Sequence, residues 1–136
     1  MFLLNLQRYN IYRNFLSLIY FRIKNKEMRI YYTKHIPLKG FSAINLFGVI
    51  FARNDFFPLS KKIIYHESIH ACQIKEMLFV FFYVWYLLEW LIRLLIYKDG
   101  IKAYKNICFE REAYENDENR SYLNNRRHWT FLKYLR

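Results

Sequence analysis

Two histidines and a glutamate stand in the order His-Glu-x-x-His at His66, Glu67 and His70, in a chain with only four histidines. Residues four positions apart lie on one face of an α-helix, so His66 and His70 can direct both imidazole rings at one metal ion. Glu67 lies about 100° further round the helix, where its carboxylate can take a proton from a metal-bound water without being a ligand. The spacing therefore predicts two metal ligands and a general base.

A third ligand must come from elsewhere, because a catalytic zinc site uses three protein ligands and keeps one position open. No further histidine follows the motif at the spacing of metzincins, which leaves His35, His128 and the acidic segment FEREAYEND. One helical face of that segment carries Glu110, Ala113, Tyr114 and Asp117. This face favours Glu110 over Glu112 as the third ligand, and the small Ala113 would let the two helices approach closely.

The segments HESIH and EREAY together resemble the gluzincin-type zinc metallopeptidases, which carry His-Glu-x-x-His on one helix and a ligand glutamate on the next packed helix. The order of strand, HExxHxxQ helix, apolar helix and FEREAY helix is similar to that of minigluzincins and compact bacterial relatives, over residues 28–133. The resemblance implies a zinc cofactor and peptide-bond hydrolysis with Glu67 as the general base. The zinc ligands that it implies are His66, His70 and Glu110.

The chain departs from this family after the alanine of EREAY, where many gluzincins have aspartate and this chain has Tyr114. A group that orients a ligand histidine must then come from another position. Candidates for this supporting role are Gln73, Glu112 and Asp117. The tyrosine or histidine that stabilises the transition state in the family also lacks a firm match, and its candidates are Tyr114, Tyr122 and His128.

The elements around the motif are predicted from β-branched and aromatic runs, breakers and capping signals. Two strands are expected, at Met28–Lys34 and Phe41–Arg53, the second passing through Gly48 with a bulge or close approach. Ser60 is a suitable N-cap for a helix over Lys61–Glu76. The expected fold class is α+β and zincin-like, mostly helical, with a small antiparallel sheet before the motif helix.

The segment Met77–Tyr97 has the length of a membrane span, although Glu89 and Arg93 lie inside it. These two residues can pair at i and i+4. Because one unbroken helix from Leu59 to Asp99 would be roughly 60 Å long, a break is expected near Glu76–Leu78, and Gly100 is expected to stop the apolar helix. The alternatives for this helix are a membrane-associated helix, which is favoured, and a core helix wrapped by its neighbours.

Composition points to an anionic partner. The formal net charge is +11 and 21% of the residues are aromatic, which suits the surface of an anionic membrane on its cytoplasmic side. Nucleic acid is not expected, because the basic residues are spread along the chain without a recognisable binding segment. The expected location is thus membrane-associated, with a cytoplasmic protein as the alternative, and no oligomeric state is predicted.

The chain is expected to hold one domain, 28–136, after a hydrophobic and basic extension, 1–27. The extension has the spacing of an amphipathic helix that either packs on the domain or lies on a membrane; alternatively, Met28 is the natural start. Cys72 and Cys108 lack the spacing of a zinc knot or disulfide framework and are expected to be reduced.

Three functions are consistent with these patterns. The first is a small, membrane-associated zinc metallopeptidase that acts on a peptide or protein, held by main-chain pairing along part of Phe41–Arg53. The second is a catalytically inactive zincin-fold protein with a binding or structural role at the membrane surface. The third is a basic membrane-surface module with an accidental motif, which predicts no bound zinc.

Overall fold

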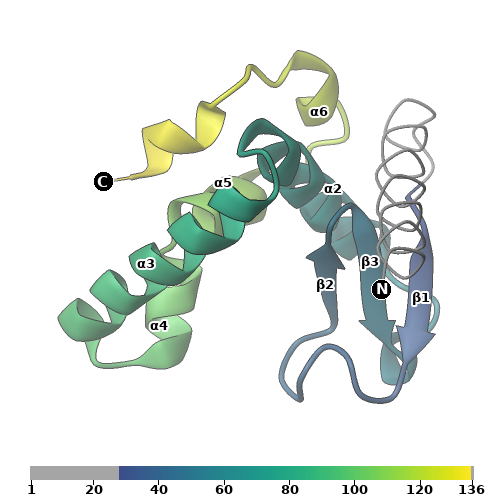
Figure 1. Ribbon diagram of the computed structural model, residues 1–136. Helices are drawn as coiled ribbons and strands as arrows, with labels where there is room; N and C mark the ends of the chain where they lie inside the picture. Colours follow the sequence, from purple (N-terminus) through teal and green to yellow (C-terminus); the bar gives the residue numbers. More distant parts are fainter. Residues whose placement is uncertain (1–27, 136) are drawn as a thin grey trace, which may run out of the picture.

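The computed structural model describes residues 28–135, and these form a mixed α+β fold with five α-helices and one three-stranded sheet (Figure 1). The predicted extension over residues 1–27, with its amphipathic helix, lies outside the described residues. The elements are β1 (Ile30–Thr33), β2 (Ala43–Leu46), β3 (Val49–Arg53), the 3₁₀ turn η1 (Asn54–Phe56), α2 (Lys61–Glu76), α3 (Val80–Tyr97), α4 (Gly100–Lys105), α5 (Cys108–Asn116), α6 (Tyr122–Asn125) and η2 (Thr130–Tyr134).

The sheet corrects two of the predictions. Its order is β1-β3-β2, with β1 parallel to β3 and β2 antiparallel to it, so the sheet is mixed rather than antiparallel. The segment Phe41–Arg53 is a hairpin rather than one strand, because Phe47 and Gly48 both have positive φ, of 53° and 84°. Two such residues form the tight turn that matches the twist of paired strands. Oδ1 of Asn45 accepts a hydrogen bond from the N–H of Gly48 and closes this turn.

Helix α2 has the predicted bounds. Oγ of Ser60 accepts a hydrogen bond from the N–H of Ile63 and caps the helix. After Glu76 the chain breaks where expected: Leu78 and Phe79 have positive φ, and the N–H of Phe79 donates to the carbonyl of Ile74. Helix α3 consequently begins at Val80, three residues later than predicted.

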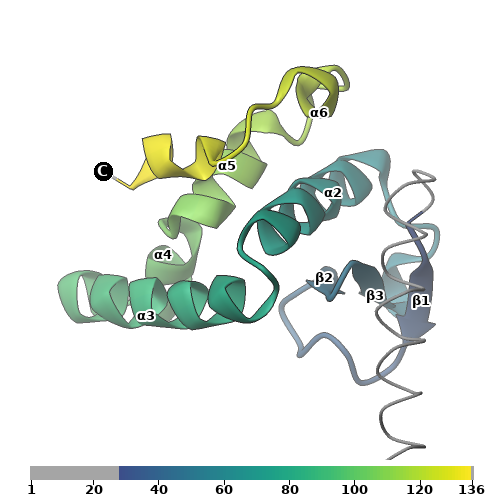
Figure 2. The same cartoon turned by 45° about the horizontal axis from the view of Figure 1, so that its top comes forward.

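The prediction that Gly100 stops the apolar helix is wrong, because Gly100 is the first residue of the next helix, α4. Lys98, with φ of 53°, ends α3, and Oδ1 of Asp99 accepts hydrogen bonds from the N–H groups of Ile101 and Lys102. This aspartate cap starts α4 at once. The chain therefore reverses over two residues, and α4 runs back beside α3 (Figure 2).

Two groups of buried apolar residues position the elements. One lies between α2, α3, α5 and η2, and its members are Ile74, Met77, Phe82, Ile107, Cys108, Phe109 and Phe131. The other joins the sheet to the start of α2, and its members are Ile50, Ala52 and Leu59. Helix α2 thus lies between the sheet and the remaining helices in both views (Figures 1 and 2). The fully buried Ala113 allows α5 to pack against α2.

Candidate metal centre

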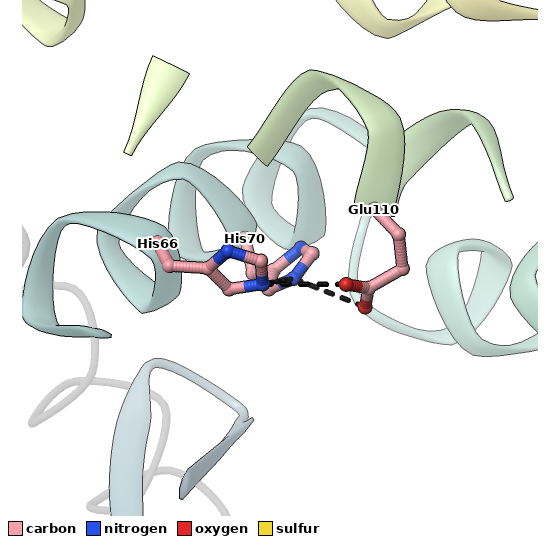
Figure 3. A group of neighbouring side chains, drawn as sticks. All are labelled: His66, His70 and Glu110. Atoms are coloured by element: carbon pink, nitrogen blue, oxygen red, sulfur yellow. Dashed lines mark hydrogen bonds and ion pairs between the residues drawn. The ribbon is translucent and has the colours of Figure 1, made fainter. Parts of the chain in front are cut away.

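Three side chains from two helices bring their ligand atoms to a common point. His66 and His70 lie one turn apart on α2, and Glu110 lies in the first turn of α5 (Figure 3). The Nε2 atoms of the two histidines are 3.1 Å apart, and each lies 3.2 Å from an oxygen of Glu110. Ligands of a tetrahedral zinc ion at about 2.0–2.1 Å lie roughly 3.3 Å from one another. The geometry of this buried group therefore fits a small divalent ion.

Gln73 fixes the proton of His70. Nδ1 of His70 is 2.7 Å from Oε1 of Gln73, while Nε2 of Gln73 donates to the carbonyl of Phe109 and to Oε2 of Glu112. Since the amide hydrogens are used in these bonds, Oε1 of Gln73 accepts and Nδ1 of His70 carries the proton. The lone pair of the neutral imidazole is then on Nε2, the atom that faces His66 and Glu110.

Asp117 acts in the same way on His66, over a longer distance. Oδ2 of Asp117 lies 3.6 Å from Nδ1 of His66, which is an electrostatic contact rather than a hydrogen bond. The buried carboxylate favours a proton on Nδ1 of His66 and leaves its Nε2 free toward Glu110. Two lone pairs and a carboxylate thus converge on one point, and such a group attracts either a proton or a metal cation.

The pKa values express this attraction. Burial acts to lower the pKa of His70, but the charge of Glu110 and its hydrogen bonding outweigh burial and raise this pKa to about 9. Burial acts to raise the pKa of Glu110, yet the two histidines hold it well below the usual range of a carboxyl group. A proton on His70 and a metal ion are accordingly alternative ways to balance the charge of Glu110.

Glu67 is buried beside this group without belonging to it. Its Oε2 has no hydrogen-bond partner among residues 28–135, and its carbonyl oxygen accepts a hydrogen bond of 2.8 Å from Nδ2 of Asn45. Burial raises the pKa of Glu67, against the opposing charges of His70 and His66. A buried carboxylate with a raised pKa and a free oxygen is suited to accept a proton and return it.

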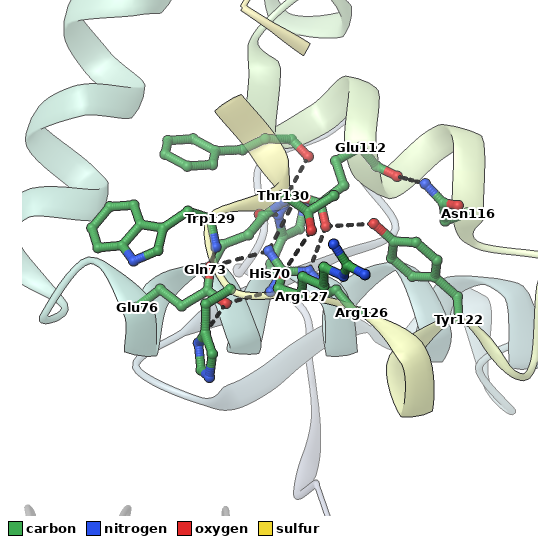
Figure 4. A network of polar contacts seen from close by, with 12 residues as sticks. His70, Gln73, Glu76, Glu112, Asn116, Tyr122, Arg126, Arg127, Trp129 and Thr130 are labelled. Atoms are coloured by element: carbon green, nitrogen blue, oxygen red, sulfur yellow. Dashed lines mark hydrogen bonds and ion pairs between the residues drawn. The ribbon is translucent and has the colours of Figure 1, made fainter. Parts of the chain in front are cut away.

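The candidate supporting residues differ in what they contact. Gln73, Glu112 and Asp117 are buried, and Gln73 links the ligand His70 to Glu112. Glu112 is not a member of the ligand group, because both of its oxygens are bound by the guanidinium of Arg126 (Figure 4). The structure therefore brings Glu110, and not Glu112, together with His66 and His70.

The three candidates for transition-state stabilisation are separated by the structure. The ring of Tyr114 lies 4.6 Å from the ring of His66, beside the ligand group. Tyr122 instead donates to Glu112, at 2.8 Å, and the exposed His128 lies 3.2 Å from Glu76. The candidates Tyr122 and His128 are therefore corrected: Tyr122 contacts Glu112 in the network of Figure 4, and His128 contacts Glu76, so neither contacts the ligand group. Of the three candidates, only Tyr114 lies beside the ligand group.

Several contacts of the site have no signal in the sequence. The hydroxyl of Tyr86, on the apolar helix α3, donates to Oε1 of Glu110 at 2.7 Å. The ring of Tyr104 lies 6.5 Å from the ring of Tyr114, and burial and the charge of Glu110 raise the pKa of Tyr104 above its usual range. Arg126 bridges Glu76 on α2 to Glu112 on α5. Composition predicts only a basic C-terminal segment, whereas this pairing needs the fold to bring the carboxylates together.

Both cysteines are free, as predicted, and neither lies in the ligand group. Within residues 28–135 the structure therefore holds one buried group of His66, His70 and Glu110 that could bind a metal ion. Comparisons of the chain with protein-family models, with curated proteins and with solved structures find no match.

Proposed function

We propose that this chain is a zinc-dependent peptidase with a minimal zincin-like fold. The observation that carries the proposal is the convergence of two Nε2 lone pairs and the Glu110 carboxylate beside the free Oε2 of Glu67. The order of hairpin, motif helix, apolar helix and glutamate helix supports the fold assignment. Two histidines and one glutamate form a ligand set that hydrolytic zinc sites use, with a fourth position left for water or substrate.

Each side chain has a separate task in this proposal. A zinc ion supplies a Lewis acid and lowers the pKa of water toward 7. Glu67 accepts a proton at its free Oε2 and later returns it to the amine that leaves. Gln73 accepts a hydrogen bond from Nδ1 of His70, and the Asp117 carboxylate lies near Nδ1 of His66, so that the Nε2 atom of each histidine would be available to bind the metal. Burial raises the pKa of Tyr114, which keeps this phenol a donor for the developing oxyanion.

Strand β2 is the proposed docking edge for an extended peptide. It lies at the end of the sheet order and contacts α2, and Asn45 ties it to the backbone of Glu67. In the register of the hairpin, the N–H groups of Ala43 and Asn45 face away from β3, since Leu46 pairs with Val49 next to the turn. A peptide substrate can add to this edge as a further strand.

Metal content and turnover test the proposal separately. Purified wild-type protein should contain zinc, and His66→Ala and Glu110→Gln should lose it. Glu67→Gln should retain zinc and lose peptide hydrolysis, because it removes only the proton acceptor. Glu115→Gln, on the exposed side of α5, is the matched control and should keep both properties.

Three results would contradict the proposal. Zinc that stays bound in both ligand variants would reject the ligand assignment. Zinc that is lost in these variants, with no cleavage by the wild type over a broad peptide library, would instead favour the alternative of an inactive zincin-fold binding protein. Absence of zinc from the wild type would favour the third reading, an accidental motif.

A further inference from the structure

Helix α3 presents a continuous apolar face to the outside. Every exposed residue of this helix is apolar, and their exposed fractions lie between 43% and 80%. These residues are Val80, Phe81, Val84, Leu87, Leu88, Leu91, Ile92, Leu95 and Ile96. At 100° per residue they cover about half of the circumference over the whole length of the helix. Soluble proteins seldom expose a contiguous apolar patch of this extent.

The opposite side of α3 is fixed to the domain by polar contacts. Glu89 accepts hydrogen bonds from Arg93 and from the N–H of Cys108, and Nη2 of Arg93 also donates to the carbonyl of Leu135. Nε1 of Trp90 donates to the carbonyl of Gly100 at the start of α4. The charged residues of α3 therefore face the protein, and the outer face has no covering element among residues 28–135.

The surroundings of this face favour an anionic lipid surface over a second copy of the chain. The chain carries a formal net charge of +11, and the exposed Lys75 and Lys98 flank the two ends of α3. A second copy would bring like charges together, whereas anionic lipids attract juxtamembrane lysines by about 1 kcal/mol each. The face also continues into an apolar groove lined by Leu88, Ile92 and the exposed Trp129, and tryptophan is enriched at membrane interfaces.

We propose that the outer face of α3 docks in the plane of an anionic bilayer and does not cross it. By length and composition alone α3 could be a membrane span, and only Phe82 and Glu89 are buried. However, α4 packs along α3 and carries the exposed Lys102 and Lys105, so a crossing helix would take both lysines into hydrocarbon. Lying in the plane, α3 buries only its apolar half, over about 27 Å.

This placement sets the position of the candidate metal centre relative to the lipid. Phe82 and Tyr86 lie on the inner side of α3, and there they contact His70 and Glu110. The ligand group is thus about one helix diameter, roughly 10 Å, from the docked face. If the proposed peptidase function holds, on which this step rests, the site would meet peptide segments close to the membrane surface.

Vesicle binding by the full chain tests the docked face. The wild type should sediment with phosphatidylcholine vesicles that contain phosphatidylglycerol, and less with phosphatidylcholine alone. The triple variant Leu88→Gln, Ile92→Gln and Leu95→Gln should bind at least about tenfold more weakly. The control is Leu38→Gln with Phe57→Gln, two apolar residues outside α3 that are 77% and 71% exposed. All variants should keep the helical circular dichroism of the wild type, and His66→Ala should keep full vesicle binding.

Depth measurements distinguish docking in the plane from crossing. A fluorescent label is placed at Val84→Cys or at Leu95→Cys, in a Cys72→Ser background, and is quenched by lipids brominated at known depths. These positions share one face and lie about 16 Å apart along the axis. Equal depths would support the proposal, and depths that differ by about 16 Å would overturn it in favour of a span.

Two further results would overturn the proposal. Wild-type binding by the triple variant would mean that another part of the chain meets the lipid. Failure of the wild type to bind vesicles would also reject the proposal; if the triple variant then converts an oligomer to a monomer, the face is a protein interface. Because vesicle binding requires no zinc, failure here leaves the proposed peptidase function untouched.

Discussion

Replacement of Gln73 by methionine should weaken metal binding without touching a ligand. Methionine has a volume close to that of glutamine, so the fully buried site remains filled. The change removes the acceptor of Nδ1 of His70 and the donor to Phe109 and Glu112. Glu112 keeps Arg126 and Tyr122 as partners, so the group left without its partner is the buried N–H of His70.

The magnitudes follow from these three hydrogen bonds. At about 1 kcal/mol net for each bond, the free energy of unfolding of the metal-free protein should fall by about 2–4 kcal/mol. Zinc affinity should fall by about 10- to 100-fold, because the ring of His70 loses the group that fixes its tautomer and orientation. Urea unfolding measures the first quantity, and competition with a chromophoric chelator measures the second.

The control for this variant is Lys75→Met, which is on the same helix but exposed. It should change the free energy of unfolding by less than about 0.5 kcal/mol and leave the zinc affinity unchanged. If Gln73→Met binds zinc within about threefold of the wild type, the orienting role assigned to Gln73 is wrong. A loss of stability alone would leave Gln73 as a packing residue.

Three other predictions follow from the same structure. The pKa of His70 is raised to about 9, from about 6.5 in the unfolded chain. Protonated His70 should therefore stabilise the metal-free protein fully below about pH 6.5, and this stabilisation should be lost as the pH rises to about 9, as urea unfolding at a series of pH values can measure. Zinc affinity should rise by up to about tenfold per pH unit below pH 9, because zinc must displace the proton of His70. Arg126→Leu should lower the free energy of unfolding by about 3–5 kcal/mol, since Glu76 and Glu112 lose their guanidinium partner; a loss below about 1 kcal/mol would contradict this. Ala43→Pro removes one outward N–H from β2 and should raise the KM for a peptide about two- to tenfold at unchanged zinc content, whereas an unchanged KM would reject β2 as the docking edge.

The parts of the fold that local signals determine could be predicted. Ser60 before a run without glycine or proline gives the start of α2, and the excessive length of an unbroken helix predicts a break near Glu76–Leu78, where the structure has its turn at Leu78 and Phe79. The hairpin was missed because Phe47-Gly48 lacks the Asn-Gly or Asp-Gly pattern typical of such turns. The parallel pairing of β1 with β3 joins distant segments, and no local pattern specifies it.

The candidate site shows the same division between local and distant contacts. His66, Glu67 and His70 lie within five residues, and the helical face of FEREAYEND selects Glu110. Tyr86 and Asn45 come from an apolar helix and a strand, and only the tertiary fold brings them to the site. Tyr122 and His128 were misplaced because sequence distance from the motif does not reveal that they turn toward Glu112 and Glu76.

The buried carboxylates of this small domain give the strongest physical reason to treat the site as functional. Glu89 and Glu112 are paired with arginines and with neutral donors, and Asp117 lies 3.6 Å from Nζ of Lys62. The two buried side-chain atoms without a hydrogen-bond partner in residues 28–135 are Oε2 of Glu67 and Oε2 of Glu110. A buried polar atom left in this state costs about 1–3 kcal/mol, and more when it is charged. A fold that satisfies its other buried carboxylates yet concentrates this cost on Glu67 of the His-Glu-x-x-His motif and on Glu110 of the ligand group is better explained by a bound cation and a proton acceptor than by poor packing.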